Sequence, residues 1–339
     1  MASLGFAAAV LCAVIMGFAI QRGTTCTVLA VNEVIEQGTV RRLAAMIEAA
    51  LWVTGGLLMA KALHLLAQMP SGFPLTGWTV AGGVLLGLGA VINGACIFGA
   101  LARLGSGEWA YAATPAGFYL GCLSYPLVAG AAPLQPLPDP SPVLSAPGWT
   151  VLPFLGFAAW RILRPVFALR TGSAGSGAAG HRAREPSSLV WSPHAATTVI
   201  GITFVISLLL AGAWAYTEAL ADLARDMAGS LTWRMLLLGA LLAGAVLGGW
   251  TAGRLRRARP PPSQILRCAL GGAAMAWGAL LVPGSNDGLV LLGMPLLWPY
   301  AWVAFAVMCA AIAAARLLRP RGLPGKAPAR GPTRDASNQ

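Results

Sequence analysis

The chain has 339 residues, of which 57% are hydrophobic and only 10% are charged. Soluble domains carry roughly one quarter charged residues, so this composition excludes an ordinary soluble protein and indicates an integral membrane protein. The formal net charge of +12 comes from basic residues scattered between apolar segments, which argues against a nucleic-acid-binding surface and fits loops that orient a membrane protein.

The first apolar segment covers residues 4–20. It has no basic stretch before it and no small-residue cleavage site after it, so we expect a retained membrane helix rather than a removed signal peptide. The sequence "QRGTTC" follows this segment and brings Arg22 and Cys26 to its end. We interpret Arg22 as a cytoplasmic residue that extends toward the membrane surface, and steering of anions is the alternative.

Nine apolar segments approach the roughly 20 residues that span a bilayer. They are 4–20, 43–67, 79–102, 110–130, 149–168, 195–215, 232–253, 268–287 and 298–316. The fifth segment is the weakest candidate, because it contains Arg161 and Arg164. The sequence therefore predicts an all-α integral membrane protein with about nine transmembrane helices.

The loops divide the chain into two membrane halves. We predict a first half over 1–168, a glycine- and serine-rich cytoplasmic linker over 169–194, a second half over 195–318 and a disordered basic cytoplasmic tail over 319–339. A further stretch, which contains Glu218, Asp222 and Asp226, is interpreted as an acidic loop between two spans.

The basic residues also predict which way the chain crosses the membrane. If the basic loops are cytoplasmic, the N-terminus lies outside and the C-terminus lies in the cytoplasm. Of the 23 basic residues, only Lys61, Arg225 and Arg234 then fall on the outer side.

The third and eighth apolar segments resemble each other. Residues 82–111 and 271–300 align without gaps at an offset of 189 and share seven identities. Because an odd number of crossings separates the two copies, they run in opposite directions through the membrane. We therefore predict an inverted repeat, an architecture in which transporters bind substrate near the bilayer midplane on helices broken by Gly or Pro.

Both copies contain a break of this kind. The breaks are "NGACIFG" (93–99), with Gly94 and Cys96, and "VPGSNDG" (282–288), with Gly284, Ser285, Asn286 and Asp287. Broken helices expose N–H groups at a half-helix start, where the helix dipole attracts an anion. Three roles stay open for Asp287: binding a coupling cation or proton, capping a half-helix, or meeting water at the outer mouth.

The motifs "QRGTTC", "NGACIFGALARLGSGEW" and "GGAAMAWGALLVPGSNDG" together resemble the YeeE/YedE sulfur-transport family. The resemblance implies an hourglass of inverted repeats in the bacterial inner membrane, with re-entrant or broken helices at its waist. It also implies transport of thiosulfate along a path marked by Cys26, Cys96 and Ser285, and a small cytoplasmic sulfur-carrier protein as partner. This chain has serine where the third family motif has cysteine.

The expected activity is import of a small sulfur-containing anion, with thiosulfate as the leading candidate. Neutral thiols suit this task, because they donate weak hydrogen bonds that also let an anion go. No P-loop and no metal-ligating cysteine–histidine spacing is present, so we expect neither a cofactor nor a metal.

Two other functions stay open. A membrane sulfurtransferase or thiol redox protein would use Cys26 or Cys96 as a reactive thiolate, but neither cysteine has a histidine or lysine beside it. In a scaffold without transport, the glycines would serve close packing only and the cysteines would be small buried hydrophobic residues.

Overall fold

The computed structural model describes residues 2–66, 69–129, 135–170, 190–224, 231–255 and 259–318. Within these residues the protein is all-helical and contains no β-strand. Most of the predicted cytoplasmic linker, 171–189, the predicted tail, 319–339, and Arg225 and Asp226 lie outside the described residues.

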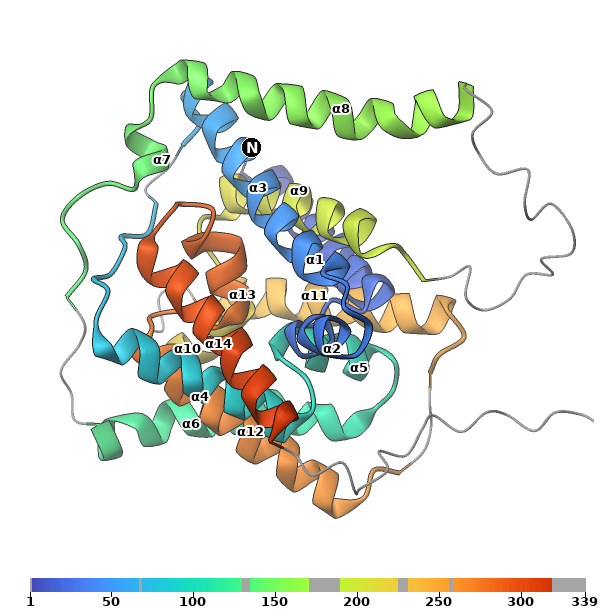
Figure 1. Cartoon of the computed structure of the whole chain (residues 1–339), viewed down its shortest axis with the longest axis vertical. Coiled ribbons are helices and arrows are strands. Elements are labelled where there is room, and N and C mark those ends of the chain that lie inside the picture. Colours follow the sequence, from blue (N-terminus) through green and yellow to red (C-terminus); the bar gives the residue numbers. More distant parts are fainter. Residues whose placement is uncertain are drawn as a thin grey trace, which may run out of the picture.

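The helices of the first half are α1 (Ala2–Gly23), α2 (Thr27–Gln37), α3 (Arg41–Ala62), α4 (Gly77–Asn93), α5 (Ile97–Gly105), η1 (Trp109–Ala112) and α6 (Ala113–Ala129). They are followed by α7 (Pro142–Ser145), η2 (Gly148–Thr150) and α8 (Val151–Arg170). The second half comprises α9 (Pro193–Ala211), α10 (Tyr216–Ala224), α11 (Leu231–Thr251), α12 (Pro262–Leu281), α13 (Asn286–Gly288), the π-helical turn η5 (Leu289–Gly293) and α14 (Pro299–Leu317). Figure 1 shows the bundle that they form.

Seven segments of the described chain are long and apolar enough to cross a membrane, rather than the nine predicted. They are 4–37, 41–62, 77–105, 193–211, 233–251, 262–281 and 299–317. The other two predicted spans also form helices, α6 and α8. α6 has only 17 residues and contains Pro126, and α8 contains Arg161. The protein is thus a multi-pass membrane protein, and seven spans satisfy both length and composition within the described residues.

One element differs from the sequence-based expectation. Glu218 and Asp222, predicted to lie in an acidic loop, belong to helix α10. The helix forms because Glu218 lies in its first turn, where a carboxylate is favourable to the helix dipole, and because Ala219 and Leu220 are buried. The loop prediction was wrong because the acidic residues interrupt the apolar pattern of a short amphipathic helix.

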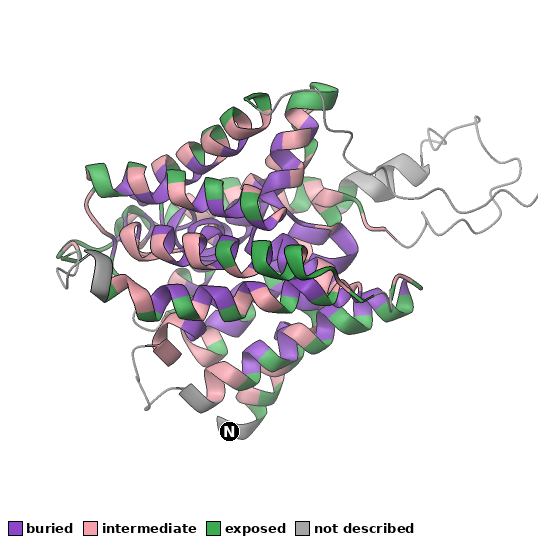
Figure 2. Cartoon of the chain, turned by 90° about the horizontal axis from the view of Figure 1, so that it is seen from below, coloured by how far each residue is buried: buried purple, intermediate pink, exposed green. Residues whose placement is uncertain are grey.

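Close helix contacts hold the bundle together, and glycine makes the closest of them possible. α4 and α12 pack antiparallel, with Gly82 against Gly278 and Gly89 against Gly271. A Cβ atom on Gly89 would lie 2.8 Å from the Gly271 carbonyl oxygen. Because lipid supplies no hydrophobic driving force between helices, such backbone approach is a main source of association energy in a membrane. Figure 2 shows the buried positions facing inward and the exposed positions on the outer helix faces.

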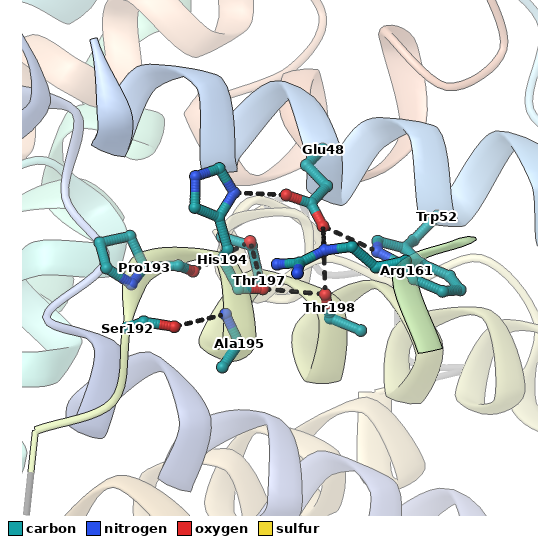
Figure 3. A network of polar contacts seen from close by, with 9 residues as sticks. All are labelled: Glu48, Trp52, Arg161, Ser192, Pro193, His194, Ala195, Thr197 and Thr198. Carbon is teal, nitrogen blue, oxygen red and sulfur yellow. Dashed lines mark hydrogen bonds and ion pairs between the residues drawn. The ribbon is translucent and has the colours of Figure 1, made fainter. Parts of the chain in front are cut away.

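Helix α8 is tied to the bundle by one polar network, centred on Glu48 of α3 (Figure 3). Arg161 of α8 donates from Nε to Glu48 Oε1 at 2.7 Å, and His194 Nδ1 of α9 contacts the other carboxylate oxygen. Thr198 Oγ1 and Trp52 Nε1 also donate to Oε1, each at 3.4 Å. In Figure 1 α8 lies at the edge of the molecule, so this carboxylate connects a peripheral helix to both halves.

Replacing Glu48 by alanine is expected to destabilise the protein by about 3 kcal/mol, because it leaves a partly buried arginine without its carboxylate. The measurement is thermal or denaturant unfolding of the purified protein in detergent. Asp139→Asn is the control, since Asp139 is exposed, and it is expected to leave stability unchanged. Equal stability of Glu48→Ala and Asp139→Asn would contradict a structural role for the network.

Candidate functional site

Four short helices begin at interruptions of the longer helices. α2 starts after the break at 24–26, α5 after 94–96, α10 after 212–215, and α13 after 282–285. Within this group α2 contacts α5, α5 contacts α13, and α13 contacts α10. Their first residues meet, so the positive ends of four helix dipoles point into one region. We call this region the waist.

Cys26 and Cys96 lie side by side at the waist. Each is the N-cap residue of its half-helix, Cys26 of α2 and Cys96 of α5, with an extended backbone. The Cys96 thiol donates to Cys26 Sγ at 3.6 Å, and Cys96 Sγ accepts the Thr27 N–H at 3.1 Å. Their exposures are 4% and 0%, so both thiols lie inside protein rather than against lipid.

Glycines shape the backbone around the two thiols. Gly94 ends α4 in the left-handed region with φ +80°, a conformation that other residues rarely adopt. Gly99 lies directly against Cys26, and a Cβ atom at this position would overlap the Cys26 thiol. The glycines that flank Cys96 therefore turn the chain and leave room for the neighbouring sulfur atom.

Ser285 and Asp287 form a second polar cluster together with Thr217. The Asp287 carboxylate accepts the Thr217 hydroxyl at 2.7 Å, the Thr217 backbone N–H at 3.2 Å and the Ser285 hydroxyl. Ser285 Oγ also lies within hydrogen-bond distance of Thr217 Oγ1, at 2.9 Å. Asp287 is 2% exposed, and it accepts donors from α10 and from the break before α13. The carboxylate thus connects the starts of α10 and α13.

Asn286 connects this cluster to the thiol pair. Its amide nitrogen donates to Thr27 Oγ1 at 3.4 Å, and Thr27 is the residue whose N–H binds Cys96. The Asn286 side chain is fully buried and its Oδ1 atom has no hydrogen-bond partner. An unsatisfied buried amide oxygen is rare, and here it lies between the two clusters.

Cavities approach the waist from opposite ends of helix α9. The larger one, which we call the outer cavity, has a volume of about 590 Å³ and is lined by Ser285, Gly284 and Thr217, with Glu218, Asp222 and Arg234 further out. A much smaller pocket of about 10 Å³ reaches Cys26 between Thr24 and Arg42. The outer cavity thus reaches Ser285, whereas the pocket beside Cys26 has room for about one water molecule and leaves both thiols buried.

Of the residues that the sequence nominated, the structure brings seven together at the waist and leaves one apart. The seven are Cys26, Gly94, Cys96, Gly284, Ser285, Asn286 and Asp287. Arg22 instead packs at the end of α1, where its guanidinium donates to Thr251 Oγ1 of α11 at 2.8 Å and lies 5.0 Å from the Phe18 ring centroid.

Sequence reasoning missed Thr27, Gly99 and Thr217. The break before α10 was missed as well, although Gly212 lies 189 residues after Gly23, at the offset of the internal repeat. That offset was the available signal. It was weak because the segments around Gly23 and Gly212 share little besides the glycine.

The chain matches a sequence-family model described as "Sulphur transport" over residues 22–314. The matched region includes α2 to α13, with all four half-helices and every residue of the waist. No curated protein matches the chain at a significant level.

Proposed function

The chain belongs to the sulphur transport family, also called YeeE/YedE, and on that basis we propose that it imports a small sulfur-containing anion through the waist. Thiosulfate is the leading candidate. The family membership supports a sulfur transporter, and we propose on the same basis that the protein is not an enzyme. The identity of the anion and its route past Cys26 and Cys96 are the proposal.

One observation supports the proposed route. Two buried thiols and four half-helix starts meet between the outer cavity and the small pocket beside Cys26. The starts of α2 and α5, which no carboxylate caps among the described residues, attract an anion to the thiols without placing a full positive charge there. Thiols donate weakly, so an anion that they hold can also leave, as conduction requires. A path of this kind attracts the anion and also lets it dissociate.

We further propose that the two halves form an inverted repeat, 1–168 against 195–318. The order of the helices supports this proposal. Each half has a long helix, a half-helix, two long helices, a half-helix and a final long helix, and the two sets are displaced by about 189 residues. At that offset Gly82 corresponds to Gly271 and Gly89 to Gly278. Gly82 packs against Gly278 and Gly89 against Gly271, which is the reciprocal contact that a pseudo-two-fold axis produces.

The proposed setting is the bacterial inner membrane, with the N-terminus outside and the C-terminus in the cytoplasm. The positions of the basic residues support this orientation. The helix ends assigned to the cytoplasm carry Arg22, Arg42, Arg103 and Arg316. A small cytoplasmic sulfur-carrier protein would accept the imported sulfur. Its role follows from the family resemblance and belongs to the same proposal.

Ser285 stands where the family motif has cysteine, and its hydroxyl is engaged by Asp287 and Thr217. We propose that serine here supports the carboxylate and that the two remaining thiols handle the anion. The sulfurtransferase alternative is less well supported, because a nucleophilic thiolate must be accessible and both thiols are almost completely buried.

Uptake of radiolabelled thiosulfate tests the proposed function. A bacterial strain that lacks its own thiosulfate and sulfate uptake should grow on thiosulfate as sole sulfur source when it expresses this chain, and it should accumulate label inside the cell. Strain and vector without the chain are the control. Growth and uptake equal to that control, with the protein present in the membrane, would refute the proposal.

A further inference from the structure

A further cavity adjoins the waist and has no part in the route proposed above. It has a volume of about 190 Å³ and is lined by Arg103, Arg267, Arg316 and Asn32, together with Leu29 and Gly94. Gly94 is two residues from Cys96, and Leu29 is three residues from Cys26. We call this space the inner vestibule.

The inner vestibule is the counterpart of the outer cavity under the 189-residue offset. Five of its eight lining residues have an equivalent that lines the outer cavity. Leu29 corresponds to Glu218, Val91 to Leu280 and Gly94 to Pro283. The two spaces are therefore equivalent mouths on either side of the waist, and they differ in charge.

The difference in charge is large. The outer cavity has two carboxylates, Glu218 and Asp222, beside one guanidinium, Arg234, which pairs with Asp222. The inner vestibule has three guanidinium groups, and no carboxylate is among its lining residues. An anion that crosses the waist inward thus moves from a mouth with two carboxylates and one guanidinium to one with three guanidinium groups.

Two of the three arginines are held in place. Arg103 donates from Nη1 to the Tyr111 hydroxyl at 2.7 Å and lies 5.1 Å from the centroid of that ring. Arg316 donates from Nε to Asn32 Oδ1 at 2.8 Å. Their acidic neighbours stand outside the cavity lining, Glu108 at 3.6 Å from Arg103 and Glu36 at 3.2 Å from Arg316.

Arg267 is the arginine of the inner vestibule whose positive charge has no paired carboxylate among the described residues. It lies on α12 and is exposed, and among the described residues no carboxylate forms an ion pair with it. The cavity volume is many times the roughly 10–15 Å³ that one water molecule needs, so a small anion fits together with part of its hydration. Guanidinium groups match the geometry of an oxyanion, because each can donate two parallel hydrogen bonds.

We infer that the inner vestibule is an oxyanion-binding station formed by Arg103, Arg267 and Arg316. If the proposed function holds, the oxyanion is the imported sulfur anion, which collects there after it passes the thiols. The same chemistry would accept the phosphate of an anionic phospholipid. The station adjoins the waist at Gly94, and Arg267 in its lining is exposed, so an anion held there can be collected and released again.

Binding of thiosulfate and of sulfate to the purified full chain in detergent tests this inference by isothermal titration calorimetry. Arg267→Gln should raise the dissociation constant by about tenfold, and the double variant with Arg316→Gln by more, because each change removes a charge-assisted hydrogen-bond donor. Arg259→Gln is the matched control: Arg259 is exposed close to Arg267 in the sequence but does not line the vestibule, and it should bind like wild type.

A second arm separates the two sources of oxyanion. The same proteins are placed in micelles with phosphatidylglycerol or with phosphatidylcholine, and retained lipid is measured by native mass spectrometry. Retention of phosphatidylglycerol that depends on Arg267 and competes with thiosulfate assigns the station to a lipid headgroup. Binding of thiosulfate that phosphatidylglycerol leaves unchanged assigns it to the transported anion. If neither ligand depends on Arg267 or Arg316, the inference is overturned.

The result can be told apart from a failure of the proposed function. Cys96→Ala should retain calorimetric binding at the station, because Cys96 does not line it. If wild type fails to import thiosulfate but Arg267→Gln still weakens oxyanion binding, the proposed function fails and the station stands. If import is normal and binding does not depend on the arginines, the station alone fails. Arg267→Gln keeps the test valid if the double variant does not fold.

Discussion

Replacing Cys96 by alanine is expected to lower thiosulfate uptake by about 10- to 100-fold, since a hydrogen bond to a charged group contributes about 1.5–3 kcal/mol. The Cys96 thiol is fully buried, lies 3.6 Å from Cys26 Sγ and accepts the first N–H of α2. Alanine removes the donor to the anion and also leaves the Thr27 N–H without its partner. The measurement is the initial rate of radiolabelled uptake, normalised to protein in the membrane.

Two variants make this result specific. Cys122→Ala also removes a buried thiol, but from α6, away from the waist, and should keep most of the uptake. Cys96→Ser retains a hydroxyl donor and an acceptor for Thr27, so its rate should lie between those of wild type and Cys96→Ala. Equal rates for Cys96→Ala and Cys122→Ala would exclude Cys96 from the path.

Replacing Asp287 by alanine is expected to destabilise the protein by about 3 kcal/mol and to abolish uptake, because it removes the shared acceptor of the Thr217 N–H and of the Thr217 and Ser285 hydroxyls in a buried region. The carboxylate joins Thr217 of α10 to Ser285 at the start of α13. Without it, the two half-helix starts on the outer side repel each other through their dipoles. Unfolding in detergent gives the stability, and whole-cell uptake gives the activity.

A chemical rescue distinguishes this structural role from simple misfolding. The space left in Asp287→Ala lies at two helix starts, so a small carboxylate such as formate should bind there and raise the unfolding temperature of the variant but not of wild type. Asp139→Asn, which changes an exposed acid, should behave as wild type with and without formate. A variant that is as stable as wild type, or that formate does not stabilise, would show that Asp287 does not replace an anion at the waist.

The opposite charges of the two mouths bear on where an anion would reside along the proposed route. Glu218 and Asp222 line the outer cavity, whereas Arg103, Arg267 and Arg316 line the inner vestibule. This difference favours occupancy of the inner vestibule by an anion, while the concentration gradient and consumption of the anion would set the net direction of transport.

The sequence predicted the helical membrane class, both cysteine breaks and the pairing of Cys96 with Ser285 in the repeat. These features depend on local properties. Apolar length predicts a span, glycine beside a polar residue predicts an interruption, and a gapless offset relates two segments. For the same reason Gly94 and Cys96 could be nominated without knowledge of their neighbours in space. The number of spans was less certain, because α6 and α8 are close to the limits of length and polarity for a spanning helix.

The roles of Thr27, Gly99, Thr217 and Glu218 could not be read from the chain. Thr217 is 70 residues from Asp287, and Gly99 is 73 residues from Cys26, yet each pair is in contact. The acidic stretch around Glu218 was predicted to be a loop because polar residues interrupt its apolar pattern, whereas its buried face against the bundle makes it helix α10.

By itself, then, the amino-acid sequence determined that the protein lies in a membrane and that its helices break at the cysteine and serine motifs, and it predicted that an internal repeat relates these breaks. Only the tertiary structure decided which breaks meet, that the Asp287 carboxylate accepts hydrogen bonds at the starts of α10 and α13, and that Arg22 packs away from the thiols. The reason is physical: a span or a break depends on residues that are neighbours in the chain, whereas a site between half-helices depends on the close packing of segments that are distant in it.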